Sequence, residues 1–161
     1  MKTNAMLLAI LLFGMSIAGC VGDEIVNPID ALAPIEYTFT GSDAADSVST
    51  SNNDTLVELT MTEGDRDHPL TWSYLSVKIS VNAGSVIECS DIADGDGCFW
   101  TQLEVGGEGR DWDMSEKISI SEDSMDLCSG GTACDVEVEL RRTTPDESST
   151  IILEDMQITA E

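Results

Sequence analysis

Four cysteines in the second half of the sequence could form covalent cross-links. Apart from Cys20, the chain contains Cys89, Cys98, Cys128 and Cys134. An even number of cysteines in an exported chain is typical of disulfides. Three pairings are possible, and we favour Cys89–Cys98 and Cys128–Cys134, because each would close a short polar segment between two predicted strands. A four-thiolate zinc site is the alternative, but its cysteines normally stand in closer pairs than these.

The loop between the first two of these cysteines is acidic and could bind calcium. Asp91, Asp94 and Asp96 stand among glycines, and Ca²⁺ prefers carboxylate and carbonyl oxygens. The loop does not follow the EF-hand pattern, since Ile92 and Leu103 would occupy its first and twelfth positions. An acidic turn closed by a disulfide, with no bound metal, is the other interpretation.

The remaining candidates for catalysis are few. His68 is the only histidine, it stands in a charged loop, and no G-x-S-x-G motif accompanies it. The sequence also lacks a C-x-x-C redox pair, a phosphate loop and a dinucleotide-binding motif. We therefore expect a chain that is not an enzyme.

Two further features could contact sugars. The three tryptophans, Trp72, Trp100 and Trp112, could form a platform for carbohydrate, but each lies in or beside an apolar strand, which favours packing in the core. Asn53-Asp54-Thr55 is the single N-glycosylation sequon, and it stands in a polar loop.

The start of the chain has the form of an export signal. Lys2 provides a basic beginning, residues 5–15 are apolar, and small residues precede Cys20. The apolar run is shorter than the roughly 20 residues of a membrane-spanning helix. Ile17-Ala18-Gly19-Cys20 resembles the lipobox of exported lipoproteins. The resemblance implies cleavage before Cys20 and a diacylglycerol on its sulfur. An ordinary signal peptide or an uncleaved anchor, with Cys20 incidental, remains open.

This interpretation predicts three segments and a location. Residues 1–19 are the signal peptide, residues 20–34 are a tether with two prolines, and residues 35–161 are the folded domain. The chain would be exported and held by its lipid on the outer face of the cell membrane.

The net charge narrows the range of partners. The chain carries 31 acidic and 7 basic side chains, a formal charge of −24. Such a field repels nucleic acid and gives no electrostatic attraction to an anionic bilayer. Low lysine with many aspartates resembles the proteins of halophilic or marine archaea. We expect the membrane through the lipid, and a cell-envelope protein, as partners.

Short alternating segments predict the fold of the domain. Apolar side chains recur at every second position, and turn residues separate the segments. The predicted strands are 35–40, 55–62, 71–81, 85–89, 98–105, 117–120, 135–142 and 150–159. Seven to eight short strands without a convincing helix favour an all-β, antiparallel, immunoglobulin-like β-sandwich. One solvated face per strand also explains how 42% apolar residues coexist with high acidity.

Three segments resemble the C-terminal β-domain of archaeal pilins and archaellins. They are residues 69–79 with an L-x-V-x-I strand, residues 111–120, which contain a turn similar to W-x-x-G-E, and the closing strand 149–159. Ser115 stands where that family usually has glycine, and the lipobox segment replaces its apolar N-terminal helix. We expect a non-enzymatic binding or structural role at the cell surface. A filament component or a calcium-dependent binding module is the alternative.

Overall fold

The computed structural model describes residues 37–65, 69–103, 109–144 and 150–161. All the described residues lie in one compact unit, Ile35–Glu161. The predicted signal peptide, Cys20 and the tether therefore lie outside the described residues, as does His68.

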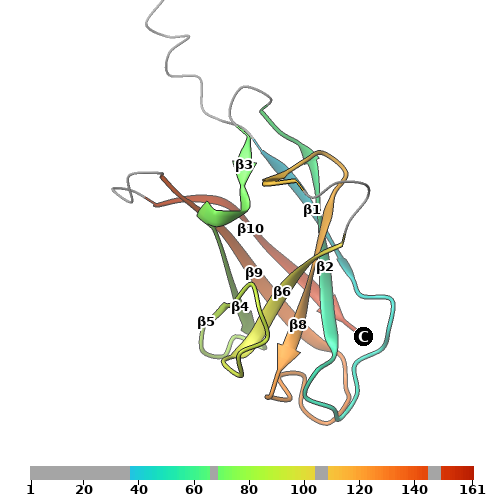
Figure 1. Cartoon of the computed structure of the whole chain (residues 1–161). Coiled ribbons are helices and arrows are strands. Elements are labelled where there is room, and N and C mark those ends of the chain that lie inside the picture. The colour runs from blue at the N-terminus through green and yellow to red at the C-terminus, as the bar shows by residue number, and fades with distance from the viewer. Residues whose placement is uncertain (1–36, 66–68, 104–108, 145–149) are drawn as a thin grey trace, which may run out of the picture. The chain divides into compact units, whose positions relative to one another are not determined.

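This unit is an all-β sandwich of two four-stranded sheets (Figure 1). The first sheet has the order β1-β2-β8-β6 and the second β10-β9-β4-β5, and all strand pairs are antiparallel. In chain order the strands are β1 (Thr38–Asp43), β2 (Thr55–Glu63), β4 (Leu75–Val81), β5 (Ile87–Cys89), β6 (Gly97–Leu103), β8 (Lys117–Asp123), β9 (Cys134–Thr143) and β10 (Thr150–Ala160).

This strand order is immunoglobulin-like. When the eight strands are lettered A, B, C, C′, D, E, F and G in chain order, the sheets become A-B-E-D and G-F-C-C′. Immunoglobulin domains divide their strands in the same way. The predicted fold class is thus confirmed.

Two additional short strands raise the total among the described residues to ten, against the seven to eight expected. β3 (Leu70–Thr71) and β7 (Asp111–Trp112) pair with each other in a separate two-stranded sheet. The predicted strand 71–81 is also interrupted, because a 3₁₀ turn, η2 (Trp72–Tyr74), separates β3 from β4. The turn takes Trp72 out of the alternation of the sheet and places its indole between two other tryptophans.

The core lies between the two sheets and follows from the alternation of side chains. In β9 the alternating residues Val136, Val138 and Leu140 are fully buried, whereas Asp135 and Glu137 are exposed. The first sheet contributes a matching set of buried side chains from β2, β6 and β8. At about 25 cal/mol per Å² of apolar surface, this burial is the main stabilising contribution.

Both edges of the sandwich are closed. On one side β5 meets β6, where Ser90 N donates to Cys98 O at 3.1 Å and Trp100 N donates to Ser90 O at 2.9 Å. On the other side β1 lies against β10, and a Cβ atom at Gly41 would overlap the side chain of Ile158. Glycine therefore permits the close approach of the two edge strands.

Candidate functional site

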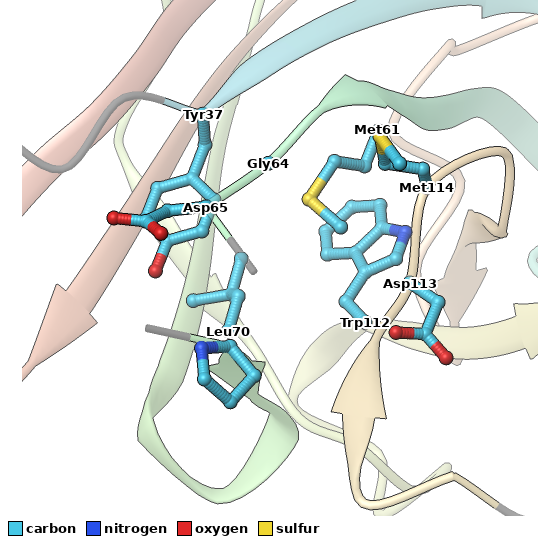
Figure 2. Close-up of a pocket in the computed structure, with 9 residues that line it drawn as sticks. Tyr37, Met61, Gly64, Asp65, Leu70, Trp112, Asp113 and Met114 are labelled. Atoms are coloured by element: carbon cyan, nitrogen blue, oxygen red, sulfur yellow. The ribbon is translucent and has the colours of Figure 1, made fainter. Parts of the chain in front are cut away.

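A pocket of about 320 Å³ lies at the end of the sandwich where β1 begins and β2 ends (Figure 2). The pairing of Thr38 with Glu63 places the start of β1 beside the end of β2. The small sheet of β3 and β7 completes the pocket. The lining residues are Tyr37, Met61, Gly64, Asp65, Pro69, Leu70, Trp112, Asp113 and Met114.

The inner part of the pocket is apolar. Met61, Leu70 and Trp112 are at most 2% exposed, and they reach the pocket from β2, β3 and β7. Leu70 and Trp112 are partners in the β3–β7 ladder. A hydrogen bond from Thr71 Oγ1 to Asp111 Oδ1, 2.6 Å long, supports this short ladder. These three side chains are themselves almost fully covered, and of the apolar lining residues Met114 is 47% exposed.

The outer part of the pocket is polar. Tyr37 and Asp65 lie side by side on one side, and Asp113 lies across the pocket from them (Figure 2). The Tyr37 hydroxyl accepts a hydrogen bond from Arg142 Nη1 at 3.2 Å. Burial raises the pKa of Tyr37, the Arg142 cation partly opposes this rise, and the Asp65 carboxylate adds to it. Tyr37 is therefore a neutral hydrogen-bonding group rather than a base.

The wall that carries Trp112 is a tight turn, and its geometry explains its sequence. Trp112 Nε1 donates to Glu116 O at 2.9 Å, and Glu116 Oε2 accepts from Asp113 N at 2.8 Å. Ser115 has a φ of 74°, the left-handed region that favours glycine. Ser115 N donates to Met61 O at 2.8 Å, which attaches the turn to β2. The turn thus needs the tryptophan, the glutamate and a residue at positive φ.

The three tryptophans pack on one another. The ring of Trp72 stacks on Trp100 with centroids 5.5 Å apart and on Trp112 with centroids 5.0 Å apart. Trp100 is 6% and Trp112 1% exposed. Both neighbours of Trp72 are therefore covered, and Phe39 packs against Trp112 from β1. Trp72 itself is partly exposed and lines two further pockets, and its ring packs on the two covered tryptophans and against the core.

Both predicted disulfides are present. Cys89–Cys98 joins β5 to β6 and thereby links the two sheets. Cys128–Cys134 closes the segment before β9. All four cysteines are buried.

Asp91, Asp94 and Asp96 lie on an exposed turn between β5 and β6. The carboxylate of Asp94 accepts hydrogen bonds from Ser90 Oγ at 2.6 Å and from Asp96 N at 3.2 Å. Among the described residues no group of three or more histidines, cysteines or acidic side chains is arranged to hold a metal ion. The hydrogen bonds that shape this turn come from the protein itself, and the calcium hypothesis gains no geometric support from it.

A buried carboxylate at the other end of the sandwich was missed by the sequence analysis. Glu122 is 1% exposed and accepts hydrogen bonds from Leu127 N at 2.7 Å and Cys128 N at 3.1 Å. Burial raises the pKa of Glu122 despite these donors. The alternation of side chains could have indicated its burial, because Glu122 lies on the same face of β8 as Ile118 and Ile120.

The pocket was missed as well, and no local pattern could have indicated it. Its residues come from four segments of the chain, 37, 61–65, 69–70 and 112–114, which meet through the long-range pairing of strands. Asn53, in contrast, lies where it was expected, exposed in the loop before β2.

In the described part of the chain, no helix is long and apolar enough to span a membrane. Comparison of the sequence with known protein families and with curated proteins finds no match to either.

Proposed function

We propose that this chain is an exported lipoprotein that displays an immunoglobulin-like β-sandwich on the outer face of the cell membrane. Its role there is binding or structural rather than enzymatic, with a cell-envelope protein as partner.

The pairing of the cysteines carries this proposal. The four cysteines of the domain form two disulfides with each other, and disulfides of this kind persist in oxidising, extracellular surroundings. Cys20 is the fifth cysteine of the sequence, and it stands at the lipidation position of the lipobox. One thiol for the lipid and two buried disulfides account for all five cysteines.

The pocket supports a binding role. Its lining combines the exposed Met114 and the buried Met61, Leu70 and Trp112 with the aromatic side chain of Tyr37. Tyr37 is already bonded to Arg142, and burial keeps it protonated, so it can orient a bound group without reacting with it. A partner's apolar side chain, with a hydrogen-bonding group beside it, fits this chemistry.

Replacing the lipidated cysteine tests the anchor. In a Cys20→Ser variant we expect loss of lipid labelling and release from the membrane fraction, because the folded domain is too acidic to adsorb to an anionic bilayer. The Cys128→Ser/Cys134→Ser variant is the control, since it removes two other cysteines and keeps the lipobox. Unchanged lipid labelling in Cys20→Ser would contradict the proposal.

The turn at residues 112–116 favours a second candidate, a filament component like the archaeal pilins and archaellins. In the related turn of that family glycine stands at the position of Ser115, and Ser115 adopts the positive φ that glycine permits. Surface filaments isolated from the producing cells should then contain this chain. Filaments without it would eliminate this candidate and leave the first one standing.

A further inference from the structure

The N-glycosylation sequon lies at the end of the sandwich opposite the pocket. β1 and β2 are antiparallel, with Thr38 paired to Glu63 and Asp43 paired to Val57. The chain enters the domain at Tyr37, beside the pocket, so the loop before β2 lies at the far end. Asn53 is the second residue before β2 in this loop.

Hydrogen bonds hold the middle residue of the sequon in place. The Asp54 carboxylate accepts from Ser49 Oγ at 3.0 Å and also from Ser49 N. Asp54 O accepts from Glu122 N at 2.8 Å. Asp54 is therefore fixed to its own loop and to the end of β8, and the position of its neighbour Asn53 is fixed with it.

Asn53 itself is exposed and uncommitted. Within the described residues its side-chain amide makes no hydrogen bond, and Asn53 is exposed to solvent. A buried or hydrogen-bonded amide could not meet a modifying enzyme, whereas this one projects into solvent from a fixed loop.

The third residue of the sequon is accessible at low cost. Thr55 is the first residue of β2, and it pairs only with Ser121 of β8, because the pairing with β1 ends at Val57. Its hydroxyl shares one hydrogen bond of 3.1 Å with Ser121 Oγ. Opening one terminal residue of a strand costs little free energy, so Thr55 can be reached in the folded domain, while Asp54 stays bonded to Ser49 and Glu122.

We infer that Asn53 carries an N-linked glycan, added from a lipid-phosphate-linked or lipid-diphosphate-linked sugar donor. The Asn53 side-chain nitrogen forms a bond to C1 of the donor sugar as the bond from C1 to the phosphate oxygen breaks. The lipid phosphate or diphosphate leaves with the electron pair, and the amide loses one proton to a base of the transferase. The inference rests on the export that the proposed function includes.

Mass spectrometry of the chain purified from membranes of the cells that produce it tests this inference. We expect the peptide containing Asn53 to carry the mass of a glycan, and we expect this mass to be lost completely in Asn53→Gln and in Thr55→Val. Thr55→Ser should retain it, because serine also completes a sequon and can bond Ser121. Asn52→Gln is the matched control, since Asn52 is an exposed neighbour outside any sequon, and it should retain the glycan.

An unmodified Asn53 peptide from the wild-type chain overturns the inference, and so does a glycan that persists in Asn53→Gln. The Cys20 peptide in the same digest separates this result from the proposed function. A lipid on Cys20 with a bare Asn53 overturns the glycan alone. A glycan on Asn53 with unmodified Cys20 supports the glycan and contradicts the lipid anchor.

Discussion

Glu122 and Ser115 are among the residues of this domain whose positions their side chains do not ordinarily favour. Glu122 is a carboxylate in the core, and Ser115 is an L-residue at positive φ. Each is compensated by specific hydrogen bonds to backbone groups. These compensations connect loops to strands, so both residues have consequences beyond their own positions.

Replacing Glu122 by glutamine should change the pH dependence of stability. Burial raises the pKa of Glu122 above its ordinary value of 4.5, so the folded chain binds this proton more tightly than the unfolded chain. The stabilisation from this group is complete at pH values below 4.5 and is lost as the pH rises through the raised pKa. The free energy of unfolding of wild type, minus that of Glu122→Gln, should therefore decrease as the pH rises.

Denaturant titrations of both proteins at several pH values measure this difference. Glutamine Oε1 can still accept from Leu127 N and Cys128 N, so the variant should fold. Glutamine Nε2 cannot accept from Asp54 N, and the loss of this 3.4 Å bond should cost about 1 kcal/mol. A difference that grows with pH would show that the pKa of Glu122 is lowered in the folded state.

Replacing Ser115 by glycine should stabilise the turn after β7. Positive φ costs an L-residue about 1–2 kcal/mol, and the greater freedom of glycine in the unfolded chain cancels part of the gain. We expect a net gain of about 0.5–1 kcal/mol in the free energy of unfolding, measured by denaturant titration. Ser115→Ala keeps the strained φ and should show no gain. Equal stability of the two variants would refute the explanation.

At the scale of elements, the sandwich depends on links between its two sheets. The Cys89–Cys98 disulfide joins β5 of one sheet to β6 of the other. Gly41 allows β1 and β10 to meet at the opposite edge. The carboxy terminus is attached there too, because Glu161 N donates to Asp43 Oδ1 at 3.1 Å and Val48 N donates to Glu161 O at 2.8 Å.

Removing the first disulfide should lower stability without changing the fold. The two cysteines are 9 positions apart in the sequence. In the chain-entropy model, removing their disulfide in Cys89→Ala/Cys98→Ala lowers the free energy of unfolding by about 2–3 kcal/mol. The midpoint of denaturant unfolding should fall accordingly, and the far-ultraviolet circular dichroism should be unchanged. Wild type measured with and without a reductant provides the comparison. An unchanged midpoint would mean that the backbone bonds around Ser90 alone hold this edge.

At the scale of the whole molecule, charge is the dominant feature. Acidic side chains outnumber basic ones 31 to 7. In the described part of the chain, three ion pairs form, namely Lys78–Glu88, Lys117–Glu58 and Arg141–Glu139. With so few basic side chains, most carboxylates have no cation to pair with, and their mutual repulsion opposes the compact state.

Salt should therefore stabilise this domain. The Debye length falls from about 10 Å at 0.1 M salt to about 3 Å at 1 M, which screens repulsion among the surface carboxylates. We expect the melting temperature to rise steadily with NaCl over this range. The same series near pH 4, where many carboxylates are protonated, should show a smaller rise. A melting temperature that is independent of salt at neutral pH would show that repulsion does not limit stability.

The sequence by itself located the main strands of this domain and favoured the disulfide pairing that the structure shows. Alternation with a period of two is local, so all eight main strands could be located. Their ends were less well predicted: β1 continues to Asp43, β8 continues to Asp123, and β4 begins only after the break at Trp72–Tyr74. The favoured disulfide pairing also rested on local information, because each pair of cysteines closes a short segment of the chain. The acidic turn and the exposed sequon were also visible in the sequence, because turn composition is local.

Only the tertiary structure decided how the ends of the sandwich are built. The pocket brings Tyr37 beside Asp65 and opposite Asp113, and Asp54 meets Glu122 although the two residues are 68 positions apart. These neighbours depend on which strands pair and in which register, a choice made by the burial of the whole core rather than by any one segment. Local sequence patterns indicate where the strands lie, whereas the contacts between the ends of the strands depend on how the whole molecule packs.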